Sequence, residues 1–248
     1  MKSFFHRIYH RIATYFAFAG FFLEIMLFVW PIVFFYKCFW PNDEKKKLRC
    51  HRLACKVIGV RVKTLPFVNI DADLSNKEFE KPAIIISNHQ SQIDIVSILM
   101  LSPKIVAVTN SWVWNFPVYK PILSYLEFYP NGGGVDNMEE KFASLIERGY
   151  SILIFPEGTR SADCKILKFH RGAFYLAEKL HADILPIYLD GAGKAFPKGG
   201  SLQKETVKVI VGNRVSADDQ SMGTNYREMT RAWHKHYIAF ENKEISEL

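Results

Sequence analysis

The segment from Ile12 to Trp40 constrains this chain most, because it is apolar over a length that can enter a lipid bilayer. Glu24 and Lys37 are its only charged residues. A cleavable signal peptide has a shorter apolar core followed by a small-x-small cleavage site, and neither feature is present. We therefore expect residues 1–42 to form a membrane-associated helical segment.

Two residues make a simple lipid-exposed span costly. Glu24 places a carboxylate in the middle of the apolar stretch, and Pro31 removes a backbone donor from a helix that passes through it. A helical hairpin that dips into one leaflet, with both ends on the cytoplasmic side, accommodates both residues. A single transmembrane helix is the alternative. Charge does not fix the orientation, because basic residues flank both ends. They are Lys2, Arg7 and Arg11 before the segment, and Lys45, Lys46, Lys47, Arg49 and Arg52 after it.

The remaining residues, 43–248, have the composition of one globular domain. The net charge of the chain is +7, which favours an anionic partner. The basic residues lie beside the apolar segment, and no zinc-finger spacing or RNP-like strand occurs. An acidic bilayer surface or a phosphorylated small molecule is therefore a better candidate than nucleic acid.

The four cysteines form no CxxC pair. Cys50-His51 with Cys55 resembles a fragment of a metal site but lacks a second pair of ligands, so we expect no metal. Reduced thiols that face the cytosol account for the cysteines.

Beyond Asp43, short β-like runs alternate with helical stretches, a pattern typical of an α/β fold with a mixed sheet flanked by helices. After the last helix, the sequence predicts a frayed acidic tail. The predicted strands are Ala83–Ser87, Ile105–Val108, Ile152–Phe155, Ile184–Leu189 and Val207–Val211, and the predicted helices are Ile93–Leu101, Asp136–Arg148, Gly172–Leu180 and Tyr226–Glu241.

His89 and Asp94 are candidates for acid–base chemistry. On a regular helix five steps of about 100° would place them about 140° apart, so they can meet only if His89 precedes the helix. The sequence allows this, because a strand ends at Ser87, residues 88–90 turn, and Ser91 can cap a helix that has Asp94 in its first turn. An imidazole held by a carboxylate is a general base. Alternatively, Ser91 and Asp94 form only a capping box.

A second block, residues 155–161, follows another predicted strand, where α/β sheets bind ligands. Gly158 permits close backbone approach, Thr159 offers hydroxyl and amide donors, and Arg160 provides a bidentate fork for phosphate. A strand-ending turn with a surface ion pair would explain any one of these residues but not the whole run.

NHQSQID at residues 88–94 and FPEGTRS at residues 155–161 resemble the two signature blocks of the glycerolipid acyltransferase family, which includes 1-acylglycerol-3-phosphate acyltransferases. The resemblance extends to Phe169, Gly172-Ala173, Pro186 and the segment GKAFPKG near Lys198. It therefore covers most of the chain from Ala83 to about Gly199. A His-x4-Asp and an FPEGTRS at this spacing seldom coincide by chance.

The resemblance implies transfer of an acyl group from acyl-CoA or acyl-carrier protein to the free hydroxyl of a lysophospholipid, with 1-acylglycerol-3-phosphate as the first candidate. His89 would be the general base and Asp94 would orient it, so no covalent acyl-enzyme is needed. The acyl donor is a substrate, and no cofactor is implied. The family's membrane-embedded N-terminal motif implies a membrane protein whose active site faces the cytoplasm.

Substrate binding would fall to the second block. Arg160, with Gly158 and Thr159, would hold the phosphate of the acceptor, and donors near the Glu157-Gly158 turn would stabilise the oxyanion.

The sequence departs from the family pattern where further basic residues are usual. Val108-Thr109-Asn110 has no Lys, and Phe128-Tyr129-Pro130 has no Arg. Lys120, or an anion nest at Gly132–Gly134, could compensate, although a flexible connector is the simpler interpretation of the glycines. A lyso-lipid with another head group, such as a lyso-aminolipid, is therefore an alternative acceptor.

Two further hypotheses compete with catalysis by His89. One is a non-catalytic membrane protein that binds lipids or acyl thioesters, and the other is a serine hydrolase that uses Ser87 or Ser91 without a G-x-S-x-G elbow. The aromatic run Trp112–Phe116 could line an acyl-chain tunnel, lie at the membrane interface or be plain core. The sequence leaves the oligomeric state open.

Overall fold

The computed structural model of the chain describes residues 2–131 and 136–248. A seven-stranded sheet forms its centre, in the order β1-β7-β6-β2-β5-β3-β4. Neighbouring strands are parallel except β6 and β7, which are antiparallel. The predicted mixed α/β sheet is confirmed. The strands are Val68–Ala72 (β1), Ile84–Ser87 (β2), Ile105–Thr109 (β3), Tyr129–Pro130 (β4), Ser151–Ile154 (β5), Ile184–Asp190 (β6) and Glu205–Val211 (β7).

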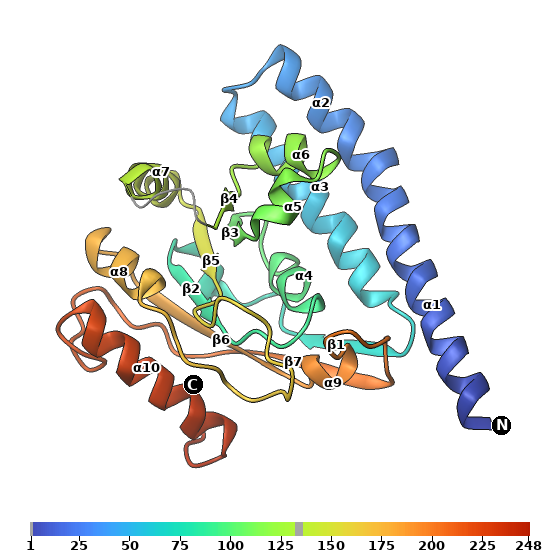
Figure 1. The fold of residues 1–248 in the computed structure, drawn as a ribbon. Helices are drawn as coiled ribbons and strands as arrows, with labels where there is room; N and C mark the ends of the chain where they lie inside the picture. The colour runs from blue at the N-terminus through green and yellow to red at the C-terminus, as the bar shows by residue number, and fades with distance from the viewer. Residues whose placement is uncertain (1, 132–135) are drawn as a thin grey trace.

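Helices cover both faces of the sheet (Figure 1), which explains the continuous apolar runs in its central strands, such as Ile84–Ile86 of β2. Ile84 and Ile86 pack on one face with helices α7 (Asp136–Glu147), α8 (Gly172–Lys179) and α10 (Tyr226–Glu241). Ile85 packs on the other face with α3 (Glu44–Lys63) and α4 (Ile93–Leu99).

Every predicted strand and helix is present, with its ends within two residues of the prediction. The frayed tail is wrong, because Leu248 is only 5% exposed and packs in the cluster that contains α10. Its carbonyl accepts a hydrogen bond of 2.7 Å from the amide of Asn213. The structure also contains elements that were not predicted from the sequence: β1, β4, α3, the 3-10 helix η2 (Lys77–Glu80) and the short helices α5 (Ser111–Asn115), α6 (Tyr119–Tyr125) and α9 (Ala192–Ala195).

The apolar segment is one continuous helical rod (Figure 1). It consists of α1 (Lys2–Glu24), a π-helical stretch η1 (Ile25–Val29) and α2 (Trp30–Phe39). A π-helical stretch widens the helix just before Pro31, where a regular ladder would lose a bond. The chain reverses only after Phe39, and α3 then runs back beside α1. The turn inside the apolar segment that a hairpin would need is therefore absent.

From Arg7 to Phe39 the rod is long and apolar enough to cross a bilayer, and only 11% of its most apolar window is buried against the rest of the protein. Such low burial differs from that of a soluble core helix. Two contacts attach its first part to the loop before β7: Nδ1 of His10 lies 2.6 Å from the carbonyl of Leu202, and Oγ1 of Thr14 accepts from the amide of Leu202 at 2.9 Å. The boundary predicted at residue 42 falls in the turn between α2 and α3, and the division into two domains stays a prediction.

Glu24, the costly residue of the apolar segment, has a partner on α3. Nε of Arg61 donates to Oε2 of Glu24 at 3.0 Å, and a second guanidinium nitrogen contacts Oε1. A bidentate pair of this kind keeps the carboxylate hydrogen-bonded at a place where water is scarce. It also fastens the apolar rod to α3 at mid-length.

We expect the Arg61→Met variant to be less stable, because it leaves the Glu24 carboxylate without its partner. The cost should be about 1–3 kcal/mol, measured as a lower thermal unfolding midpoint in detergent. The double variant Glu24→Leu/Arg61→Leu should recover much of the loss, since no charge remains to be paired. Arg49→Met, at an exposed position of the same helix, is the control. Equal effects of Arg61→Met and Arg49→Met would contradict the role of the pair.

Candidate active site

Both signature blocks lie in loops that leave the same edge of the sheet. Residues 88–92 connect β2 to α4, and residues 155–161 follow β5. Because β2 and β5 are adjacent and parallel, their carboxyl ends meet, as expected for a ligand site in an α/β fold. The amide of Ser161 donates to the carbonyl of His89 at 2.8 Å, which joins the two loops directly.

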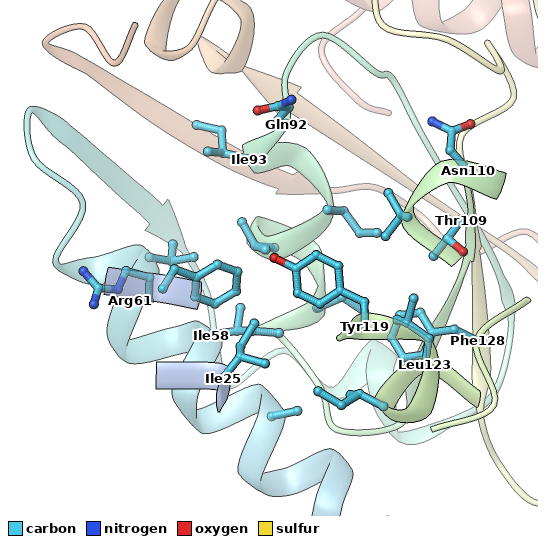
Figure 2. A pocket seen from close by; sticks show the side chains of 18 of the residues that line it. Ile25, Ile58, Arg61, Gln92, Ile93, Thr109, Asn110, Tyr119, Leu123 and Phe128 are labelled. Carbon is cyan, nitrogen blue, oxygen red and sulfur yellow. The ribbon is translucent and has the colours of Figure 1, made fainter. Parts of the chain in front are cut away.

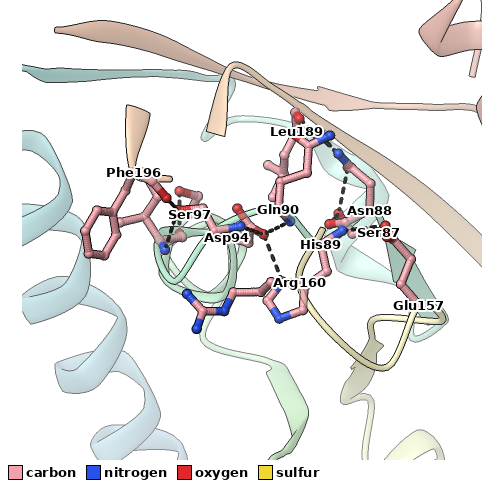
Figure 3. A network of polar contacts seen from close by, with 12 residues as sticks. Ser87, Asn88, His89, Gln90, Asp94, Ser97, Glu157, Arg160, Leu189 and Phe196 are labelled. Carbon is pink, nitrogen blue, oxygen red and sulfur yellow. Dashed lines mark hydrogen bonds and ion pairs between the residues drawn. The ribbon is translucent and has the colours of Figure 1, made fainter. Parts of the chain in front are cut away.

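Asp94 organises the first loop (Figure 3). Its Oδ2 accepts from Nδ1 of His89 at 2.8 Å and from the backbone amides of Gln90 and Ser91 at 2.7 Å each. The two interpretations of this block therefore hold together, because the carboxylate satisfies amides ahead of α4 and also holds the imidazole. An imidazole that donates from Nδ1 carries its lone pair on Nε2. His89 is thus arranged as a base, with its ring stacked on Phe155 at 4.2 Å between centroids.

The hydroxyl groups of the two serines near His89 already donate hydrogen bonds. The hydroxyl of Ser87 donates to the carbonyl of Asn88 at 3.2 Å, and that of Ser91 donates to the carbonyl of Phe196 at 2.9 Å. Both side chains are fully buried. This geometry argues against a serine hydrolase.

Glu157 faces the protein interior and not the ligand side of its turn. Its two oxygens accept from the backbone amides of His89 at 2.8 Å and Leu167 at 2.9 Å, and the residue is only 2% exposed. Burial raises the pKa of Glu157 to about 8, and hydrogen bonds from the two amides oppose this shift. Both carboxylate oxygens of Glu157 therefore accept hydrogen bonds from backbone amides, one of which belongs to His89. This arrangement gives no support to the predicted contact between Glu157 and substrate.

The next residues of the block are open to ligand. Gly158 has φ of +68°, a left-handed conformation that favours glycine, and its amide is taken by the carbonyl of Phe155 at 3.0 Å. Thr159 is exposed, and the half-buried Arg160 lines the same pocket as His89. No ion pair joins its guanidinium to any residue that the structure describes. Nζ of Lys198 donates to the backbone carbonyl of Arg160 at 3.2 Å, which brings a second cation to this loop.

His89 and Arg160 are among the residues that line an apolar pocket of about 440 Å³. Its walls come from the apolar rod and from helices α3 to α6 (Figure 2), and Trp112 and Val113 of the predicted aromatic run are among them. Most of this lining was not predicted from the sequence, because it comes from several separate helices. Other lining residues are Ala17, Phe21, Ile25, Ile58, Val96, Leu123 and Phe128.

The lip of the pocket formed by Val108, Thr109 and Asn110 carries no cation. Lys120 is exposed on α6 and is not part of the lining, and Gly132–Gly134 lie outside the described residues. Arg61 lines the pocket but is paired with Glu24. Within residues 2–131 and 136–248, no three His, Cys, Asp or Glu side chains gather as a metal site would require.

Comparison with known proteins gives a consistent result. The family model described as Acyltransferase matches residues 68–190. The chain is 28% identical over 202 residues to the chloroplastic 1-acyl-sn-glycerol-3-phosphate acyltransferase LPAT1 of Arabidopsis thaliana, covering 78% of this chain and 54% of that protein. It is 30% identical over 177 residues to the chloroplastic enzyme BAT2 of Brassica napus, covering 68% and 51%.

Among solved structures, the crystal structure of the 1-acyl-sn-glycerophosphate acyltransferase PlsC from Thermotoga maritima superimposes with a TM-score of 0.73 at 22% identity, over 97% of this chain and 99% of that one. This likeness shows a shared fold. The family model and the two plant relatives show that the chain belongs to the glycerolipid acyltransferase family. It spans about half the length of these two relatives.

The raised pKa of Glu157 predicts a pH-dependent stability. The folded protein keeps this proton up to about pH 8, whereas the unfolded chain releases it near 4.5. Between these values the folded state binds more protons, so the free energy of unfolding falls as the pH rises, by at most about 1.4 kcal/mol per pH unit, and levels off above the folded pKa.

Glu157→Gln cannot titrate, so its unfolding midpoint should depend less on pH than that of the wild type. Thermal unfolding in detergent across this pH range measures the difference. Glu80→Gln, at an exposed position, should keep the wild-type slope. If Glu157→Gln also keeps it, the buried carboxyl does not hold its proton.

Proposed function

We propose that this protein transfers a fatty acyl group from an acyl-CoA or acyl-carrier-protein thioester to the free hydroxyl of a lysophospholipid, with 1-acylglycerol-3-phosphate as the first candidate acceptor. One observation carries the proposal: His89, which Asp94 holds through Nδ1, lines the same apolar pocket as Arg160, whose guanidinium has no ion-pair partner among the described residues. A base, a phosphate ligand and a site for an acyl chain are thus within reach of one amphiphilic molecule. The Arabidopsis thaliana and Brassica napus relatives are 1-acyl-sn-glycerol-3-phosphate acyltransferases by name, which supports this acceptor.

In the proposed reaction, Nε2 of His89 takes the proton of the acceptor hydroxyl as the oxygen attacks the thioester carbonyl. Collapse of the tetrahedral intermediate breaks the C–S bond, and the departing thiolate takes the proton back from the imidazolium. Asp94 holds the imidazole in position and stabilises its charged form, as its 2.8 Å contact with Nδ1 permits. Donor and acceptor react directly, so no acyl-enzyme forms.

Thr159 and Arg160 are the residues proposed to bind the oxyanion and the phosphate. The amide of Gly158 is occupied within its turn, so the proposed donor for the oxyanion is the exposed Thr159. Arg160 holds the phosphate of the acceptor, and Lys198 adds positive charge beside it. Glu157 acts through His89, whose backbone it holds.

The apolar rod supports a membrane location, with the acyl chain entering from lipid past a wall that the rod itself provides. Membrane lipids and the thioester donor are the proposed partners, and the active site is proposed to face the cytoplasm. The donor thioester is a substrate, so the proposed reaction needs no cofactor. Nucleic acid has no part in it.

A different acceptor is the second candidate, because the lip at Val108–Asn110 lacks a cation. A lyso-aminolipid or another lyso-lipid would need less positive charge than a phosphate monoester. A lipid-binding protein without turnover is the third candidate, and it would keep the pocket without needing the His89–Asp94 geometry.

We expect His89→Ala to lower acyl transfer by at least about 100-fold, because the general base is lost. The variant should still fold, since Asp94 keeps its bonds to the amides of Gln90 and Ser91. The assay uses purified protein in detergent with a long-chain acyl-CoA or acyl-carrier-protein donor. His170→Ala, at an exposed position of the loop before α8, is the control. Acyl transfer that persists in His89→Ala would contradict the proposed mechanism. If the wild type binds lipid but shows no turnover, the third candidate, a lipid-binding protein, is favoured.

Arg160→Gln should raise the KM for 1-acylglycerol-3-phosphate by about 10- to 100-fold, the usual effect of losing hydrogen bonds to a charged group. The unfolding midpoint should barely change. Arg171→Gln, an exposed cation on the following loop, should leave KM unchanged. A panel of lyso-lipids tested on both variants identifies the acceptor: if another lyso-lipid is preferred and Arg160→Gln does not affect it, the phosphate assignment is wrong.

A further inference from the structure

The wall of the apolar pocket contains one phenol. Tyr119 opens α6, and its ring packs between Phe22 of the apolar rod and Phe116, with centroid distances of 6.4 and 5.1 Å. These contacts fix the plane of the ring. Figure 2 shows the hydroxyl of Tyr119 directed across the pocket and away from α6.

No hydrogen bond within the described part of the chain engages this hydroxyl. Burial alone raises the pKa of Tyr119, with no contribution from a charged group. Other tyrosines of this core are paired: the hydroxyl of Tyr125 donates to the carbonyl of Trp40 at 3.3 Å, and that of Tyr237 donates to the carbonyl of Ile86 at 2.9 Å. Tyr119 differs from them because it faces a cavity.

A phenol in apolar surroundings gains nothing over phenylalanine unless its hydroxyl finds an acceptor. Most of the lining residues offer no side-chain acceptor, and the polar ones Gln92, Thr109 and Asn110 make no hydrogen bond to this hydroxyl in the described part of the chain. An acceptor oxygen carried by the occupant of the pocket would engage it.

We propose that Tyr119 donates a hydrogen bond to an oxygen carried by the acyl chain that occupies the pocket, and so selects chains that bear such an oxygen. This inference rests on the proposed function, because it takes the occupant to be an acyl chain. The shared chemistry is an acceptor oxygen in an otherwise apolar chain. It can come from the ester carbonyl of the chain already on the lysophospholipid, or from a hydroxyl or keto group on a substituted fatty acyl chain.

The test compares the wild type with Tyr119→Phe on two pairs of substrates. The first pair is 1-acyl and 1-O-alkyl lysophosphatidic acid, which differ by the ester carbonyl. The second pair is unsubstituted and hydroxylated acyl thioesters, with the hydroxyl placed at several positions. Relative kcat/KM and equilibrium binding are both measured. Tyr125→Phe removes a hydroxyl that is already paired outside the pocket, so it should alter stability without altering selectivity.

The wild type should prefer the oxygen-bearing member of one pair by about fivefold to tenfold, and Tyr119→Phe should abolish that preference while keeping its kcat on the other member. Loss in the first pair assigns the ester carbonyl, and loss in the second assigns a substituted chain. Equal selectivity of the two proteins in both pairs overturns the inference. If the wild type shows no turnover, the proposed function fails, while the binding ratios still decide the role of Tyr119.

Discussion

The buried carboxylate of Asp94 is the interaction on which the site depends. One oxygen receives the imidazole of His89 and two backbone amides, so the shape of the β2–α4 loop and the orientation of the base are set together. The tight turn between β2 and α4 leaves the amides of Gln90 and Ser91 without backbone acceptors, and buried amides need a hydrogen-bond partner. The side chain that meets this need also holds the imidazole, which is why a helix-capping pattern and a catalytic pattern coincide in the sequence.

The second block extends the same arrangement. Glu157 holds the amide of His89 from behind, and Ser161 holds its carbonyl. The backbone of His89 is thus held at both its amide and its carbonyl by the loop that follows β5. Of this block, Phe155 and Arg160 line the pocket and Thr159 is exposed, whereas Glu157 and Ser161 position the loop that carries His89.

The sequence predicted the central strands and long helices because a two-sided apolar strand and an amphipathic helix each leave a local pattern. It also brought His89 to Asp94, since the strand–turn–helix geometry is local. It did not predict that Glu157 turns inward, because the amide of Leu167 that it binds lies ten residues away across a loop. For the same reason, the sequence did not predict that Glu24 pairs with Arg61 or which residues line the pocket. These contacts join segments whose spacing carries no periodic signal. The short helices α5 and α6 are too brief to show a period.

The pocket takes part of its wall from Ala17, Phe21 and Ile25 of the apolar rod. The rod therefore forms part of the pocket as well as an exposed apolar surface. Without the rod, the pocket would lack this part of its wall. Substitutions in the rod would consequently reshape the pocket without altering His89, Asp94 or Arg160.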